Sequence, residues 1–283
     1  MKQFFLSIVI LLSVHSRAQF DSIVARDMIA ICNSYTFSEL YKSDTAIIPK
    51  AYQKKYTSEV FGMDNVFQIY TNGNTAVFNI RGSTAKKSSW LENIYSAMIP
   101  ATGNMKVSGE NFDYCFAKDK GACVHSGYAL GIAFLRKEVI AQINKLNKEG
   151  IYDIIITGHS QGGALSNMLR AYLENLSAKE ISKKNTYRVY AFAAPMVGNV
   201  KFADEYNQRY ELNKSSYNIV NVSDAIPTFP LTYNDTNYFK SNINNLLFDR
   251  KSFSMKKIIK DGMVNMMEPG VRYGVNKTGT ATQ

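Results

Sequence analysis

A serine with a glycine two residues away on either side comes shortly after an apolar run. The run covers 152–156, and the pentapeptide Gly158-His159-Ser160-Gln161-Gly162 comes after it. Where a strand ends, the chain turns sharply and a helix begins, a serine at the turn holds its hydroxyl above the sheet beside backbone amides. A glycine on either side avoids crowding in so tight a turn. The pattern therefore predicts a nucleophile elbow in which Ser160 could form an acyl-enzyme.

Two further side chains stand where acyl transfer would need them. This chemistry requires a nucleophile, donors for the developing oxyanion, a base for the serine proton and an acid that orients the base. The backbone N–H of Gln161 follows the nucleophile, and the loop that carries Ser83 is placed to supply a second donor. Asp224 follows an apolar strand and comes after Ser160, as the order serine, acid, histidine requires. The alternatives are a turn serine at Ser83 and an Asx-turn or helix cap at Asp224, before Pro227.

Strands and helices alternate around these residues. The segment that contains Asn72 and Gly73 predicts a β-hairpin, and a long helix with apolar periodicity is expected to stop at Gly150 after an extended stretch at 101–122. The expected strands cover 66–70, 75–80, 152–156, 187–193 and 217–222, and the expected helices cover 21–40, 132–146, 162–176 and 200–210. This order predicts an α/β fold in one domain, with a mostly parallel sheet covered by helices on both faces. The candidate site residues then lie at the carboxyl ends of strands.

The N-terminus has the features of a removable signal peptide over residues 1–18. Lys2 precedes the apolar segment Phe4 to Val14, and Ser16-Arg17-Ala18 offers small residues at the cleavage positions. We expect cleavage between Ala18 and Gln19 and a secreted or periplasmic protein. The apolar segment is shorter than the ~20 residues that cross a bilayer, and we expect no transmembrane segment in the mature chain.

Charge and composition restrict the partners. The chain has a net charge of +10, or +8 without Lys2 and Arg17. Its lysines are scattered and no basic helix or RNA-stacking motif accompanies them, so we expect no nucleic-acid partner. A basic soluble surface is the simpler interpretation, and attraction to anionic lipid surfaces is the alternative.

Three cysteines bear on cross-linking and metal binding. Cys115 and Cys123 lie close together in a loop, so we expect a disulfide between them in an oxidising compartment. The alternative is that these two and Cys32 are reduced and buried. No Cys-x-x-Cys motif is present, and we expect no metal site.

Five ordered motifs resemble those of the class 3 (fungal-type) lipases. They are FNIRGST at 78–84 followed by Trp90, VHSGY at 124–128, TGHSQGGA at 157–164, AFAAPMVGN at 191–199 and NVSDAIPTFP at 221–230, within a match over 66–233. The resemblance implies an α/β-hydrolase fold over 19–283, with Ser160 as nucleophile, Asp224 as triad acid, and Ser83 with Gln161 as oxyanion hole. It also implies a lipid or small ester substrate of acylglycerol type, met at a lipid–water interface, and no cofactor.

The segment 83–98 occupies the place of that family's lid. Trp90, Leu91, Ile94 and Met98 are candidates for a lipid-facing stripe on it, with plain core packing as the alternative.

The chain departs from the family in its base, because no histidine follows Asp224. Its three histidines are His15, His125 and His159. His15 is lost with the signal peptide, and His159 is a poor partner for the hydroxyl of its own neighbour. The resemblance suggests that His125 is a structural histidine buried beside the elbow.

We therefore expect that the sequence is a fragment whose base lies beyond residue 283. The alternatives are a non-catalytic descendant that binds lipid or acyl ligands, and an enzyme that uses an unusual base. A serine peptidase or thioesterase would share the elbow, but the motifs around Ser83 and Asp224 argue against it. Residues 240–283 match no motif.

Overall fold

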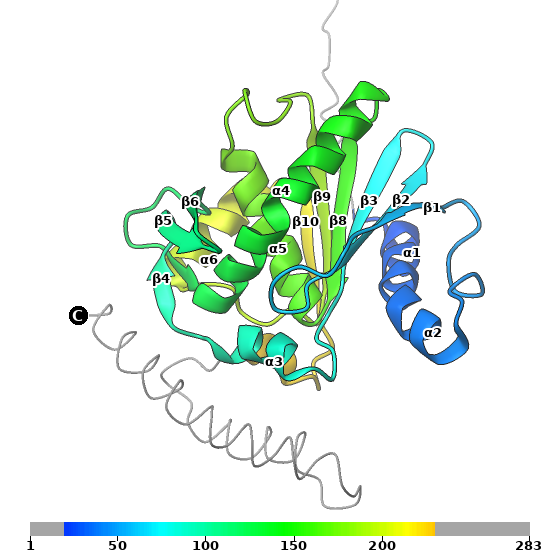
Figure 1. Cartoon of the computed structure of the whole chain (residues 1–283), viewed down its shortest axis with the longest axis horizontal. Coiled ribbons are helices and arrows are strands. Elements are labelled where there is room, and N and C mark those ends of the chain that lie inside the picture. The colour runs from blue at the N-terminus through cyan, green and yellow to red at the C-terminus, as the bar shows by residue number, and fades with distance from the viewer. Residues whose placement is uncertain (1–19, 230–283) are drawn as a thin grey trace, which may run out of the picture.

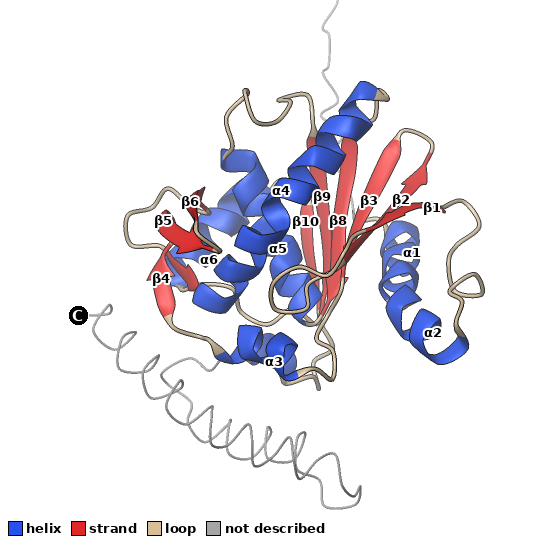
Figure 2. Cartoon of the chain, viewed as in Figure 1, coloured by secondary structure: helices blue, strands red, loops and turns tan. Residues whose placement is uncertain are grey.

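A six-stranded sheet forms the centre of the computed structural model, which describes residues 20–229 (Figures 1 and 2). The strand order is β1-β2-β3-β8-β9-β10. These strands cover Gln53–Thr57, Phe67–Asn72, Thr75–Ile80, Asp153–His159, Thr186–Phe192 and Ser216–Ile219 respectively. β1, β2 and β3 pair antiparallel, whereas β3, β8, β9 and β10 pair parallel. The predicted α/β fold is confirmed; the predicted signal peptide and the region 240–283 lie outside the described residues.

Helices cover both faces of this sheet. α4 (Ser126–Lys148) and α5 (Gln161–Asn175) lie on one face, and α1 (Ser22–Cys32) lies on the other (Figure 1). Successive residues of a strand point to opposite faces, so a doubly covered strand is apolar throughout. In β8, Ile155 belongs to the apolar cluster beneath α1, and Ile156 belongs to the larger cluster beneath α4 and α5. This double burial explains the unbroken apolar run that precedes the glycine-flanked serine.

The helix predicted over 21–40 is two helices, because α1 ends at Cys32 and α2 covers Ser34–Tyr41. Asn33 joins them. Its backbone N–H donates to the Ile29 carbonyl at 3.2 Å, and its side-chain amide donates to the same oxygen at 3.1 Å. These bonds satisfy a carbonyl that the end of a helix leaves free, so the chain can change direction there.

The extended stretch predicted at 101–122 contributes to two small antiparallel sheets. β5 (Thr102–Val107) pairs with β6 (Glu110–Cys115), and β4 (Met98–Pro100) pairs with β7 (Cys123–His125). The predicted hairpin in the main sheet is also present, with Asn72 opposite Thr75 across a two-residue turn. Gly73, the first residue of that turn, has φ +54°, a conformation that favours glycine.

The predicted disulfide between Cys115 and Cys123 is not formed, and all three cysteines of the described chain are free and half-buried. Cys115 lies opposite Thr102 in the β5–β6 ladder, whereas Cys123 lies opposite Pro100 in the β4–β7 ladder. The Cys115 thiol accepts a hydrogen bond from the Thr102 hydroxyl at 3.4 Å. Strand pairing therefore assigns the two thiols to different sheets, although they are close in sequence.

The last strand of the sheet is shorter than predicted. β10 ends at Ile219, and Val222, placed in the strand by its apolar pattern, is 97% exposed. Its parallel neighbour β9 ends at Phe192, and Ala193 then turns with φ +48°. Around β10 lie α6 (Val200–Tyr206), the π-helix η1 (Asn207–Glu211) and the 3-10 helix η2 (Ile226–Thr228). Among residues 20–229, no helix combines the length and apolarity that a bilayer crossing requires.

Candidate active site

Ser160 occupies the turn between β8 and α5. β8 ends at His159, α5 begins at Gln161, and Ser160 itself has φ 57° and ψ −127°. Such a conformation costs a non-glycine residue on the order of 1–3 kcal/mol and persists only where the surroundings fix it. Here the Ser160 N–H donates to the Phe192 carbonyl at 2.9 Å, and the Ser160 carbonyl accepts the N–H of Gly163 at 2.8 Å. The strand–turn–helix context predicted for a nucleophile elbow is confirmed.

The glycines beside this turn allow two backbone segments to touch. A Cβ added to Gly162 would lie 2.2 Å from the Ile80 carbonyl oxygen and 3.0 Å from the Arg81 carbonyl carbon. One added to Gly158 would lie 2.3 Å from the carbonyl oxygen of Gly162. The absence of side chains thus lets the first turn of α5 pack against the end of β3, which leads to Ser83.

The side chain of Gln161 anchors the loop that carries Ser83. Its Oε1 accepts the hydroxyl of Ser83 at 2.9 Å and that of Ser89 at 3.1 Å. Asn93 donates to the Ser83 Oγ at 2.8 Å. Ser89 and Asn93 are one turn apart on α3 (Lys87–Ile94), and both are buried. Ser83 and the backbone of Gln161 were predicted from the sequence, but this side-chain network was not. The i, i+4 spacing of Ser89 and Asn93 is the signal that could have indicated it.

Two residues beside Ser160 have backbone N–H groups without a partner in the described structure. Among the described residues, the N–H groups of Ser83 and Gln161 donate no hydrogen bond to a protein acceptor. The Gln161 N–H also belongs to the first turn of α5, where the helix dipole favours negative charge. Because the Ser83 hydroxyl donates to Gln161 Oε1, the free donors are the two backbone amides. The arrangement has the components of an oxyanion hole.

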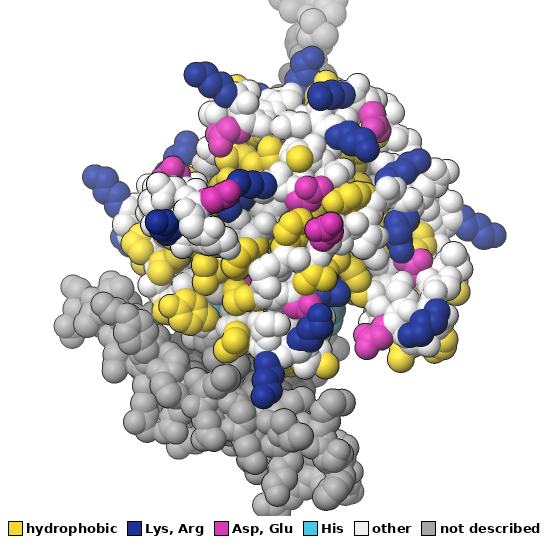
Figure 3. Space-filling model, in the orientation of Figure 1, with side chains coloured by type: hydrophobic (Ala, Val, Ile, Leu, Met, Phe, Trp, Pro, Cys, Tyr) yellow, Lys and Arg dark blue, Asp and Glu magenta, His cyan; other side chains and the backbone are white. Residues whose placement is uncertain are grey.

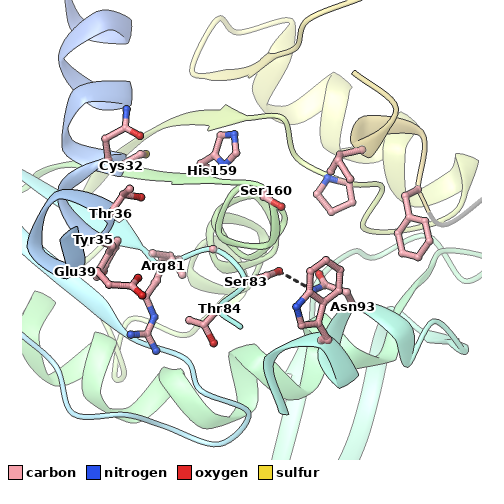
Figure 4. Close-up of a pocket in the computed structure, with 17 residues that line it drawn as sticks. Cys32, Tyr35, Thr36, Glu39, Arg81, Ser83, Thr84, Asn93, His159 and Ser160 are labelled. Atoms are coloured by element: carbon pink, nitrogen blue, oxygen red, sulfur yellow. Dashed lines mark hydrogen bonds between the residues drawn. The ribbon is translucent and has the colours of Figure 1, made fainter. Parts of the chain in front are cut away.

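A cavity of about 380 Å³ opens over Ser160 (Figure 4). Its volume falls in the range of small-molecule sites. Its lining residues come from the sheet end, from α3, from η2 and its flank, and from the α1–α2 junction. Ser83 and Ser160 both line it, so the candidate nucleophile and the loop of the candidate oxyanion hole face the same cavity.

Asp224 lies in the turn after β10. Its Oδ1 accepts the N–H of Ile226 at 2.9 Å, so the Asx-turn weighed from the sequence is present. That turn uses one carboxylate oxygen, and the other has no hydrogen-bond partner among residues 20–229. Burial lowers the pKa of His159, and the negative charge of Asp224 partly offsets this effect. The structure thus brings Asp224 within electrostatic reach of the residue that precedes Ser160.

Comparison with known proteins agrees with this geometry. The family model for lipase (class 3) matches residues 77–234, more than half of the chain. The chain belongs to the class 3 lipase family. The part of it that the family model matches contains the elbow, the Ser83 loop and Asp224.

Individual relatives of this member of the class 3 lipase family are distant. It is 32% identical over 87 residues to lipase ZK262.3 of Caenorhabditis elegans, which is 31% of this chain and 23% of that protein. It is 28% identical over 166 residues to a secreted mono- and diacylglycerol lipase of Malassezia restricta, which is 57% of this chain and 48% of that protein. The chain thus spans from about a quarter to a half of these relatives. The fold resembles that of a fungal lipase in an inhibitor complex, with a TM-score of 0.52 and 19% identity over 74% of this chain and 73% of the other.

His125 is a structural residue in this lipase-family chain, as the resemblance suggested. It is fully buried and caps α4, where its Nδ1 accepts the N–H of Tyr128 at 3.4 Å. Its Nε2 lies 3.1 Å from the Asn93 carbonyl, to which it donates if Nδ1 is the acceptor. Burial lowers the pKa of His125 to about 4, so the ring is neutral near pH 7. Both ring nitrogens are engaged away from Ser160.

The second described histidine, His159, is not positioned as a base for the Ser160 hydroxyl either. Within residues 20–229, neither His125 nor His159 forms a hydrogen bond with Ser160. In Figure 4, the side chains of His159 and Ser160 diverge from the end of β8. The prediction that His159 is a poor partner for its neighbour agrees with this geometry.

The segment predicted as a lid contains α3. Trp90 lines the cavity and Leu91 is 41% exposed, whereas Met98 belongs to β4 and is half-buried. The predicted stripe is therefore divided between two elements, and the side chain of Ile94 lies outside the described part of the structure. Figure 3 shows apolar side chains over much of this face, among them a group near the place of β4, with basic side chains dispersed between them.

Glu92 is a buried carboxyl group on the inner face of α3. Its Oε2 accepts the side-chain amide of Asn65 at 2.7 Å, and its Oε1 has no partner among the described residues. It fits against α4 because Gly131 has no side chain; a Cβ there would lie 2.3 Å from Oε1. Burial raises the pKa of Glu92 to about 8, and the hydrogen bond from Asn65 and the nearby side chain of Gln161 only partly oppose this. The folded protein therefore keeps Glu92 protonated at neutral pH.

This burial predicts a pH dependence of stability. Between its ordinary pKa near 4.5 and about 8, the unfolded chain loses the Glu92 proton while the folded chain keeps it. The free energy of unfolding should therefore fall as pH rises, by up to about 1.4 kcal/mol per pH unit. Glu92→Gln should remove this slope. Urea unfolding at several pH values measures it, with Glu149→Gln on the exposed surface as control.

The window from pH 6.5 to 8 separates this effect from that of His125. His125 has its pKa lowered to about 4, so its contribution to stability rises with pH from about 4 to 6.5, opposite to that of Glu92. An equal slope from pH 6.5 to 8 in the natural protein and in Glu92→Gln would contradict the assignment.

Proposed function

We propose that this chain is a secreted or periplasmic carboxylic ester hydrolase that cleaves lipid esters of acylglycerol type through an acyl-enzyme on Ser160. The observation that carries the proposal is the strained Ser160 turn in the lining of a cavity, next to two backbone amides that have no partner within residues 20–229. Family membership supports the substrate class, and the predicted signal peptide supports export.

In the proposed reaction the Ser160 Oγ attacks the ester carbonyl carbon, and the N–H groups of Ser83 and Gln161 stabilise the oxyanion that forms. Loss of one such donor typically costs about 3–4 kcal/mol of transition-state stabilisation. Collapse of the intermediate breaks the bond to the alcohol, which leaves with the proton that the base has taken from the Ser160 hydroxyl. Water then attacks the acyl-enzyme and releases the fatty acid. One carboxylate oxygen of Asp224 has no partner among residues 20–229, and it would orient the triad base during formation and hydrolysis of the acyl-enzyme.

A second candidate function is binding of an acyl ligand without hydrolysis. It is favoured by one observation: neither histidine among residues 20–229 contacts the Ser160 hydroxyl. The cavity and the oxyanion donors would then bind an acyl chain and its carbonyl.

A fluorophosphonate probe distinguishes the two functions. The purified full chain is treated with the probe, and the modified residue is located by mass spectrometry. Labelling of Ser160, absent after heat denaturation, together with hydrolysis of a short-chain ester, supports the hydrolase. An unlabelled Ser160 in a folded protein that still binds fatty acid would support the binding protein.

A further inference from the structure

α3 buries polar side chains and exposes an apolar one. Ser89, Glu92 and Asn93 are 2%, 0% and 7% exposed, whereas Leu91 is 41% exposed. A helix on the surface of a protein ordinarily turns its apolar side chains inward. These inward side chains of α3 instead carry a hydroxyl, a carboxyl and an amide group, which need hydrogen-bond partners within the protein.

The buried side chains of α3 bond to three other parts of the molecule. Their partners are Gln161 of α5, Tyr128 of α4, and Asn65 in the loop before β2. The Ser89 hydroxyl donates to Gln161 Oε1 at 3.1 Å, and Asn93 Oδ1 accepts the hydroxyl of Tyr128 at 3.1 Å. A buried polar group that loses its partner costs about 1–3 kcal/mol, so displacement of α3 from the body of the protein is strongly disfavoured.

Gln161 also joins the two residues of the candidate oxyanion hole. Its Oε1 accepts the Ser83 hydroxyl at 2.9 Å, and the Asn93 amide donates to the Ser83 Oγ at 2.8 Å (Figure 4). The backbones approach closely as well, because a Cβ on Gly82 would lie 2.7 Å from the His159 carbonyl oxygen. The free backbone N–H groups of Ser83 and Gln161 thus belong to residues whose side chains bond to each other, and α3 completes this network.

The candidate nucleophile is accessible with α3 in this position. Ser83 and Ser160 are half-buried, and both line the cavity. Trp90 lines the same cavity, so α3 forms part of its wall. Within residues 20–229, access of an ester to Ser160 therefore requires no movement of α3.

A lipid surface has little to gain from displacing α3. It can shift the balance between two positions of a helix only by binding one of them more tightly. Displacement would expose the polar groups of Ser89, Glu92 and Asn93, which favour water over lipid. Leu91 is exposed already. The described side chains therefore give an interface no preference for a displaced α3.

We propose that Gln161 is a positioning residue whose side chain fixes α3 and the Ser83 loop in the arrangement that the oxyanion requires, so that the site hydrolyses dissolved, monomeric esters and needs no lipid–water interface to become active. The inference rests on the proposed function of Ser160 and adds to it the physical state of the substrate. It departs from the interface that the family resemblance implies.

The first experiment measures hydrolysis of tributyrin by the full chain below and above the solubility limit of this ester. The natural protein should show a hyperbolic rise of rate below the limit and no abrupt increase above it. Gln161→Met keeps the size of the side chain and the backbone N–H but removes the acceptor of Ser83 and Ser89. Its kcat on dissolved tributyrin should fall about 10²-fold, as expected for a displacement of about 1 Å in the site, with KM nearly unchanged.

Tyr206→Phe is the matched control, because it also removes a buried polar group. The Tyr206 hydroxyl bonds to Asn167 at 3.0 Å and to Ser216 at 2.8 Å, away from the cavity. This variant should lose stability in urea unfolding, as Gln161→Met does, but keep the natural kcat. Three outcomes would overturn the proposal: an abrupt increase of rate above the solubility limit in the natural protein, the natural kcat in Gln161→Met, or an equal loss of kcat in Tyr206→Phe.

Absence of turnover in every protein would contradict the proposed function of Ser160 instead. Hydrogen exchange then decides whether α3 is fixed, because it requires no catalysis. The amides of α3 in the natural protein should exchange at the same rate with and without vesicles of dioleoylphosphatidylcholine, and about tenfold faster in Gln161→Met. Faster exchange in the natural protein on addition of vesicles, or natural exchange in Gln161→Met, would show that Gln161 does not fix this helix.

Discussion

Replacing Ser160 with alanine is expected to lower ester hydrolysis by about 10⁴-fold or more, because only binding and oxyanion contributions remain when the nucleophile is lost. Covalent labelling by a fluorophosphonate should disappear. Initial rates on a short-chain ester measure the loss, and Ser182→Ala, in the loop between α5 and β9, is the control. If Ser160→Ala kept the natural rate, the acyl-enzyme proposal would be excluded.

The same position allows a test of backbone strain. Alanine keeps the Cβ that makes φ 57° and ψ −127° unfavourable, whereas glycine does not. Ser160→Gly and Ser160→Ala should be equally inactive, but the glycine variant should be more stable by about 1 kcal/mol. Urea unfolding of the two variants measures this difference. Equal stability would mean that the turn stores no strain, although the loss of hydrolysis would still identify the nucleophile.

The sequence predicted those features of the site that depend on residues close together in the chain. The apolar run before Ser160, the flanking glycines and the following helix each have a backbone cause that the chain itself carries. Asp224 was predicted from its place after a strand, and the structure adds that an Asx-turn uses one of its oxygens. The sequence contains no histidine after Asp224, and in the described structure neither His125 nor His159 takes the place of the base.

The residues that were missed depend on contacts between distant segments. The side chain of Gln161 meets Ser83 and Asn93 only because α5, β3 and α3 converge. The break between α1 and α2 at Asn33 interrupts an apolar period that continues across it. Cys115 and Cys123 pair in different sheets. Their closeness in the sequence does not reveal this strand pairing.

Gly162→Ala is expected to destabilise the protein by about 1–3 kcal/mol and to lower hydrolysis by about 10²-fold. Two effects of opposite sign compete at this position. Alanine is the better helix former by about 1 kcal/mol, which would stabilise α5. The new Cβ, however, would lie 2.2 Å from the Ile80 carbonyl oxygen, a backbone atom that cannot turn aside. Relief of this contact requires α5 to move away from the end of β3.

Such a movement would separate the two halves of the oxyanion hole, because the Gln161 N–H belongs to α5 and the Ser83 N–H follows β3. Gly163→Ala is the matched control: its Cβ would lie 3.0 Å from the nearest atoms, on Ala194 and Phe192, so the gain in helix propensity should offset most of the contact. Urea unfolding and ester hydrolysis are measured for both variants. A stabilised and fully active Gly162→Ala would show that propensity outweighs the contact, and that the approach of α5 to β3 does not set the geometry of the site.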